Sequence, residues 1–136
     1  MKKDIEIPVV KDVEIALVKE YNDDFLMDCW YAYLFNNSQK DIEAIMIISQ
    51  ATGIIDGENR VSSLFRHAFP KVTPGSFQKI ELLDEGVFVL DNTFMLTYFQ
   101  EGKLFDKNFT FPAGSIKDEY IQSLTNKEKR GIVVNS

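Results

Sequence analysis

Apolar and polar residues alternate in short runs along most of the chain, and turn-forming residues separate the runs. The clearest runs lie at 13–20, 77–82 and 94–99. A period of two residues is typical of a β-strand with one face in a core and the other in water. About seven such runs lie between 12 and 112. The sequence therefore predicts an all-β protein, an antiparallel β-sandwich of the immunoglobulin or fibronectin type.

The length and composition fit one domain with flanking segments. A chain of 136 residues, 45% of them hydrophobic, can build one core without metals or disulfides. We predict an N-terminal extension at 1–11, the sandwich at 12–112, and a short helix and tail at 113–136. The helix is predicted because Ser115 and Asp118 match a capping pattern, with apolar residues at helical spacing around them. These apolar residues are Ile116, Tyr120, Ile121 and Leu124.

One predicted strand, at 28–35, is apolar on both faces. Trp30, Ala32 and Leu34 share one face, and aromatic residues fill the other. Such a strand is either central, with its outer side covered, or it displays a row of rings. Its rings and two residues of a later strand form the candidate interaction surface: Trp30, Tyr31, Tyr33, Phe35, Arg66 and His67.

The middle of the chain contains the most ambiguous segment. Residues 41–50 fit both a helix and a strand. A strand is favoured because the isoleucines are β-branched and the turn-rich connection at 36–40 suits a hairpin. Residues 51–59, which include two glycines, are predicted to form an exposed loop. A further strand is predicted at 60–69.

The runs at 94–99 and 104–109 predict a hairpin closed by a two-residue turn at Glu101 and Gly102. This turn places Tyr98 opposite Phe105 and Leu96 opposite Lys107. One face of the hairpin is then apolar, interrupted only by Lys107, whose ammonium can extend past the sheet edge. The predicted core residues are Phe94, Leu96, Tyr98, Phe105 and Phe109.

An excess of negative charge excludes several classes of partner. Aspartate and glutamate number 21 against 15 lysines and arginines, a formal net charge of -6. This charge repels phosphate backbones and anionic lipids, so we expect neither nucleic acid nor a membrane as partner. Cys29 is the only cysteine, which rules out an internal disulfide and suggests a buried, unreactive thiol. Residues 1–8 lack the apolar core of a secretion signal, so we expect a cytoplasmic protein.

Candidate acid–base chemistry depends on His67, the only histidine. On a strand, Ser63 shares a face with His67 but lies two pleats away, too far for a direct hydrogen bond. The chain also contains no G-x-S-x-G turn. We therefore expect no catalytic residues, with structural or surface roles for His67 and Arg66.

Acidic residues cluster around a glycine at 55–59. Calcium prefers such oxygen ligands, but the spacing lacks the alternating aspartates and the distal glutamate of a calcium-binding loop. Turn formation explains the same composition. The sequence therefore predicts no metal and no cofactor.

Four stretches carry a resemblance to known proteins: 30–37, 63–67, 79–81 and 102–105. In these residues the chain resembles a group of short, uncharacterised bacterial proteins, some of which are labelled phenylalanyl-tRNA synthetase alpha subunit. The likeness spans most of the chain, and its motifs are loose. It implies no particular catalytic or cofactor-binding residue.

The absence of catalytic motifs favours binding over catalysis. We predict a non-enzymatic cytoplasmic β-sandwich that binds a protein partner or a second copy of itself, through an aromatic sheet face or an edge strand. The alternative is a carbohydrate or small-ligand binding module that uses the aromatic rings.

Overall fold

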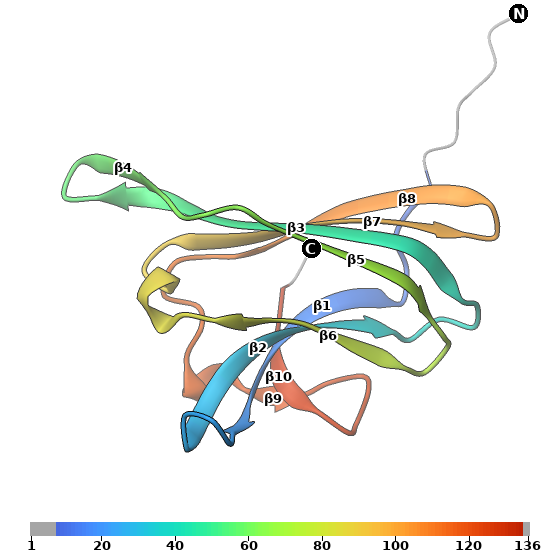
Figure 1. Cartoon of the computed structure of the whole chain (residues 1–136), viewed down its shortest axis with the longest axis horizontal. Coiled ribbons are helices and arrows are strands. Elements are labelled where there is room, and N and C mark those ends of the chain that lie inside the picture. The colour runs from blue at the N-terminus through green and yellow to red at the C-terminus, as the bar shows by residue number, and fades with distance from the viewer. Residues whose placement is uncertain (1–7, 135–136) are drawn as a thin grey trace, which may run out of the picture.

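The computed structural model describes residues 8–134, which form two antiparallel β-sheets packed face to face (Figure 1). Sheet A has the strand order β6-β2-β1-β10-β9, and sheet B has the order β4-β3-β7-β8, with β5 also paired to β3. The ten strands of this part are β1 (Val13–Asn22), β2 (Met27–Asn36), β3 (Ile42–Ile55), β4 (Glu58–Val61), β5 (Phe65–Val72), β6 (Phe77–Leu83), β7 (Asp91–Gln100), β8 (Lys103–Phe111), β9 (Gln122–Ser123) and β10 (Arg130–Val133). The predicted all-β class is confirmed, but the predicted count of about seven strands is wrong.

Helical structure within residues 8–134 is limited to two 3-10 turns, η1 (Glu85–Val87) and η2 (Asp118–Tyr120). Neither is long and apolar enough to cross a membrane.

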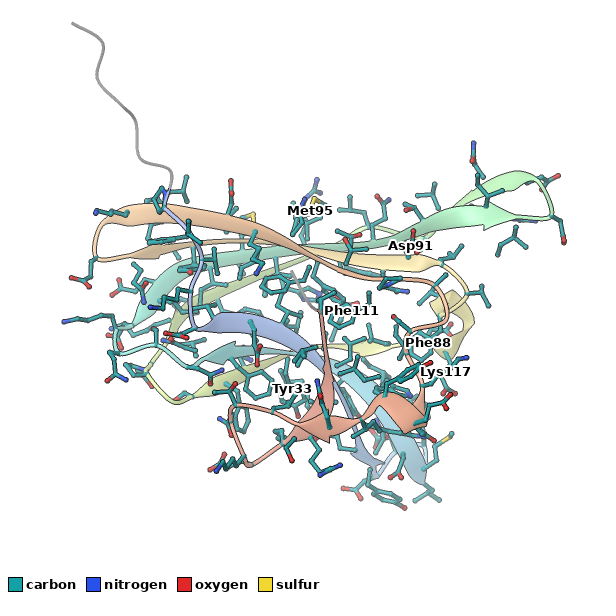
Figure 2. The ribbon with its side chains drawn as sticks, turned by 180° about the vertical axis from the view of Figure 1, so that it is seen from behind. Tyr33, Phe88, Asp91, Met95, Phe111 and Lys117 are labelled. Atoms are coloured by element: carbon teal, nitrogen blue, oxygen red, sulfur yellow. The ribbon has the colours of Figure 1, made fainter. Side chains whose placement is uncertain are left out.

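The main core lies between the two sheets and follows the alternation of the sequence. On β1, Val13, Ile15 and Leu17 are buried in it. Phe111, at the end of β8, lies between the two layers, whereas Met95 of β7 lies on the outer side of sheet B (Figure 2). On each strand, alternate side chains therefore point into this core, and the side chains between them point to the outer face of the sheet.

Strand β2 lies between β6 and β1 in sheet A and is buried on both faces. One set of its side chains joins the main core: Trp30, Ala32 and Leu34. The other set forms a second apolar cluster on the outer face of sheet A: Tyr31, Tyr33 and Phe35. Of the two alternatives left open by the sequence, the structure shows the first, a strand whose outer side is covered.

The β7–β8 hairpin has the predicted register. Tyr98 pairs with Phe105, and Lys107 lies on the core face with its ammonium 4.9 Å from the centre of the Phe109 ring. Glu101 and Gly102 both have positive φ values, 50° and 76°. These values belong to the tight turn whose twist matches that of paired strands.

Strand β3 confirms the strand predicted at 41–50, but it continues to Ile55. Asp56 and Gly57 turn the chain tightly, with φ values of 52° and 78°, and β4 returns beside β3. The exposed loop predicted at 51–59 is therefore wrong. The predicted strand at 60–69 divides into β4 and β5, which pair with the same edge of β3. The β3–β4 hairpin projects beyond the two layers (Figure 1).

The predicted C-terminal helix is also wrong. Ile116 and Ile121 contact the main core, whereas Leu124 belongs to the cluster on the outer face. Tyr120 is 51% exposed. A helix would place residues four apart on one stripe and could not reach both faces of sheet A. Packing against two cores therefore outweighs the local capping pattern, and β9 and β10 complete sheet A instead.

Candidate functional site

The four aromatic rings predicted as an interaction surface are buried. Trp30 is 2% exposed and packs edge-on against Phe88 in the main core, with ring centroids 6.2 Å apart. Tyr31, Tyr33 and Phe35 are at most 7% exposed. Tyr33 lies beside the C-terminal segment (Figure 2). These rings offer no open platform for a sugar, so an exposed binding surface has to be formed by other residues.

Arg66 and His67 lie on opposite faces of β5. Arg66 is exposed and forms no ion pair among residues 8–134. His67 Nε2 lies 3.1 Å from Oε1 of Glu81 on β6, and the Ser49 hydroxyl donates a hydrogen bond of 2.5 Å to the same oxygen. The Glu81 carboxylate therefore links the two sheets.

The histidine, carboxylate and serine are not arranged as a catalytic triad. In a triad the imidazole contacts the hydroxyl and withdraws its proton. Here the Ser49 hydroxyl donates to Glu81 instead of His67. A cavity of about 130 Å³ lies beside Ser49 and Glu81. The three side chains thus stabilise the contact between the sheets next to a small cavity.

A larger groove, of about 410 Å³, lies where β6 ends beside β2. Strand β6 pairs with β2 only from Trp30 onward. Residues 27–29 consequently have no neighbouring strand on that side among the described residues. Residues 25, 27–30 and 82–85 line this groove. We refer to it below as the β2 groove.

Large apolar side chains are exposed around the β2 groove. The exposed fractions are 59% for Phe25, 53% for Met27 and 41% for Leu82. Tyr21 and Leu26 are exposed in the same β1–β2 hairpin. Burial of one such side chain contributes roughly 1.5–3 kcal/mol. A group of exposed apolar residues beside a groove is typical of a binding surface.

The hairpin tip is held in an unusual conformation. The side-chain oxygen of Asn22 accepts hydrogen bonds from the backbone N–H groups of Asp24 and Phe25, at 2.8 and 2.9 Å. Leu26 follows with a φ of 55°, in the left-handed region that branched apolar residues rarely adopt. Leu26 is 74% exposed and so contributes little to either core. Strain of this kind, without gain in packing, often marks a functional segment.

Three carboxylates line the β2 groove: Asp28, Asp84 and Glu85. Asp84 caps η1, whereas Asp28 and Glu85 form no ion pair within residues 8–134. Lys19 nearby is bound to Asp118 at 2.8 Å. The hydrogen bond to Asp118 raises the pKa of Lys19, and the charges of Glu85 and Asp28 add to this effect. The groove therefore combines apolar walls with an acidic rim.

A second polar centre lies on the outer face of sheet A. Glu20 accepts hydrogen bonds from the Tyr33 hydroxyl and from Lys79 and Lys129, each lysine nitrogen lying 2.9 Å from a carboxylate oxygen. Burial favours a higher pKa for Glu20, but the three partners outweigh it and lower the pKa to about 2. Burial raises the pKa of the Tyr33 hydroxyl, and its hydrogen bond to Glu20 raises it further. Glu20 is consequently a fixed anion at neutral pH.

The sequence reasoning missed the β2 groove, although one signal for it was present. Phe25, Leu26 and Met27 directly follow the turn-forming residues 22–24. Three consecutive apolar residues at a hairpin tip are more than a core can bury there. The other wall comes from Leu82 on β6, and no local pattern connects it with the hairpin.

Comparisons with protein-family models, with curated proteins and with solved structures find no match for the chain. The resemblance to short bacterial proteins and the immunoglobulin type of the sandwich therefore stay predictions.

Proposed function

We propose that the chain is a non-enzymatic binding protein that holds an extended, basic and apolar segment of a protein partner in the β2 groove. The coincidence of exposed apolar side chains, unpaired carboxylates and a free strand edge carries this proposal. Apolar side chains of the partner would cover Phe25 and Leu82, and its lysine or arginine would meet Asp28 and Glu85. We include a cytoplasmic setting in the proposal, where Cys29 in the groove stays reduced.

An extended segment suits this site because residues 27–29 leave one strand edge without a partner. A peptide that adds a strand to a sheet gains main-chain hydrogen bonds, while alternate side chains enter pockets and provide specificity. The free edge is short, so main-chain pairing alone would give weak binding. The apolar walls and the acidic rim therefore have to supply much of the affinity and the selectivity.

Contacts elsewhere support binding over catalysis. The Ser49 hydroxyl donates to Glu81 instead of His67, so Ser49 is not held as a nucleophile activated by that histidine. Among the described residues that line the β2 groove, the titratable ones are Asp28, Cys29, Asp84 and Glu85, so no histidine or lysine is present there to act as a base.

A short peptide of alternating lysine and leucine, carrying a fluorophore, tests the proposal directly. Its anisotropy should rise on titration with the protein, and its affinity should fall in high salt because the rim is acidic. The amide resonances that shift in an NMR titration should be those of residues 25–30 and 82–85. A peptide of alternating glutamate and leucine should bind at least about tenfold more weakly.

Two matched variants distinguish binding in the β2 groove from a general effect of the protein's negative charge. Asp28→Lys should weaken binding of the lysine–leucine peptide about tenfold, because it reverses one carboxylate of the rim. Asp106→Lys makes the same change on exposed residue 106 of β8 and should leave the affinity unchanged. Equal effects of the two variants, or resonance shifts away from the groove, would rule out the β2 groove as the binding site.

A further inference from the structure

The C-terminal segment crosses the outer face of sheet A from one edge to the other. Strands β9 and β10 lie at the edge beyond β1. Between them the chain reaches back across the sheet, where Leu124 is 5% exposed within the outer cluster. At the far edge, Asn126 Nδ2 donates a hydrogen bond of 3.4 Å to the carbonyl oxygen of Gly75, just before β6. Residues 122–133, called the strap below, therefore cover the full width of the sheet.

The strap is fixed by a cation site as well as by apolar contacts. The Lys129 ammonium lies 5.1 Å from the centre of the Tyr33 ring and 5.3 Å from that of Phe77. It also donates a hydrogen bond to the ionised carboxylate of Glu20. Two ring faces and an anion around one ammonium form a selective site for a lysine side chain. The sandwich thus recognises the strap through a leucine and a lysine placed five residues apart.

The chain leaves β8 through a tight turn and reaches the strap over residues 116–121, of which Ile116 is buried in the main core. The N–H of Ser115 donates to the carbonyl oxygen of Pro112 at 3.0 Å, and Gly114 within this turn has a φ of 79°. From there the chain passes from sheet B to sheet A. Backbone pairing of the strap with β1 involves only three residue pairs. A short turn under conformational constraint and a segment held by few backbone pairs are features that favour exchange between chains.

We propose that a second copy of this chain binds through its strap: the straps of two copies exchange, and each covers the outer face of the other's sheet A. A second copy is the occupant that this face fits, because the chain's own strap already shows the complementary contacts. Exchange preserves the contacts of Leu124 and Lys129, whereas release into water would expose the outer cluster. Ile132 on the strap also fills the main core, which disfavours an uncovered state.

Tethering to its own sandwich gives each strap an effective concentration in the millimolar range. The closed monomer therefore dominates in dilute solution. Exchange is expected when the protein is refolded at millimolar concentrations. A strap that has not yet docked then meets the sandwich of another copy about as often as its own.

Charge reversal on the two sides of the lysine site tests the exchange. Neither Glu20→Lys nor Lys129→Glu can form the ion pair with its own strap. In a mixture of the two, an exchanged heterodimer restores one native and one reversed pair. After co-refolding of equal amounts of one isotope-labelled and one unlabelled variant, native mass spectrometry should show about five heterodimers for each homodimer, whereas random pairing gives one.

A control pair shows whether charge reversal alone causes association. Asp41 and Lys71 form an ion pair of 3.8 Å within the sandwich and outside the strap. Mixing Asp41→Lys with Lys71→Asp should give no excess of heterodimer. A strap-variant mixture that stays monomeric, or that forms dimers in statistical proportions, would overturn the proposal.

A change in the turn provides a test that leaves the lysine site intact. Gly114→Val places a branched side chain at a positive φ, strains the closed turn and should raise the dimer fraction severalfold. Gly57→Val introduces the same strain in the β3–β4 turn, where φ is 78°, and should not change the dimer fraction. Equal dimer fractions in the two variants would count against exchange at this turn.

Discussion

At the scale of single residues, Glu14 and Glu20 on β1 show that the surroundings of a carboxyl group decide whether its pKa is raised or lowered. Glu20 has a pKa of about 2 because Tyr33, Lys79 and Lys129 stabilise its anion. Burial instead raises the pKa of Glu14, although Lys107 partly opposes the shift. The sequence shows both glutamates on one strand but could not predict this difference, since their partners come from distant strands.

Glu20→Gln is expected to destabilise the protein at neutral pH. The pKa of Glu20 is lower in the folded state than the ordinary glutamate value of 4.5, so the stabilisation is complete above pH 4.5 and is lost as the pH falls toward 2. Its side chain is 23% exposed, and solvent screening reduces the expected effect to about 1–2 kcal/mol. Urea unfolding should show this loss at pH 7 and almost no difference between variant and wild type at pH 2.

Glu14→Gln is the matched control for this prediction. Removing an anion whose pKa is raised by burial should not destabilise the protein at pH 7. An equal loss of stability in both variants would show that the partners of Glu20 are not the cause.

At the scale of elements, strand alternation was predictive for the long, regular strands of the two sheets. It correctly predicted β1, β2 and the register of the β7–β8 hairpin, because each pattern is local. It failed for the C-terminal segment, where Ile116 and Leu124 enter different cores. It also failed at 51–59, where the Asp56 and Gly57 turn was interpreted as part of a loop. The first error arose where tertiary contacts decide between local alternatives, whereas the second overlooked a local signal, because an Asp-Gly pair between two strands is typical of a hairpin turn.

The β7–β8 turn can be improved by one substitution. Glu101 has a φ of 50°, a conformation that glutamate adopts at a cost and that asparagine tolerates. Glu101→Asn should therefore raise the free energy of unfolding by about 0.5–1 kcal/mol, measured by urea denaturation. Glu101→Ala removes the same side chain without relieving the backbone and should give no such gain. A similar gain from alanine would point to charge instead of turn geometry.

At the scale of the whole molecule, sheet A is covered on both faces, by sheet B and by the strap. This layering could not be read from the sequence, because the strap was interpreted as a helix and the β2 groove joins a hairpin tip to β6. What the sequence did show was a strand apolar on both sides, which requires a cover on each. The identity of that outer cover depends on contacts between residues about a hundred positions apart, such as Glu20 and Lys129.

Gly131→Ala tests whether the strap opens as a unit, the step that exchange requires. A Cβ atom at Gly131 would lie 2.2 Å from the carbonyl oxygen of Leu17, so β10 would have to move away from β1. Amides of β9 and β10 should then exchange hydrogen about 100-fold faster, equivalent to about 3 kcal/mol, while those of β3 and β7 keep most of their protection. Gly86→Ala, which meets only the side chain of Asp84 at 3.2 Å, should leave the strap amides unchanged. Equal acceleration in all strands would mean that the sandwich and the strap unfold together, and that exchange requires complete unfolding.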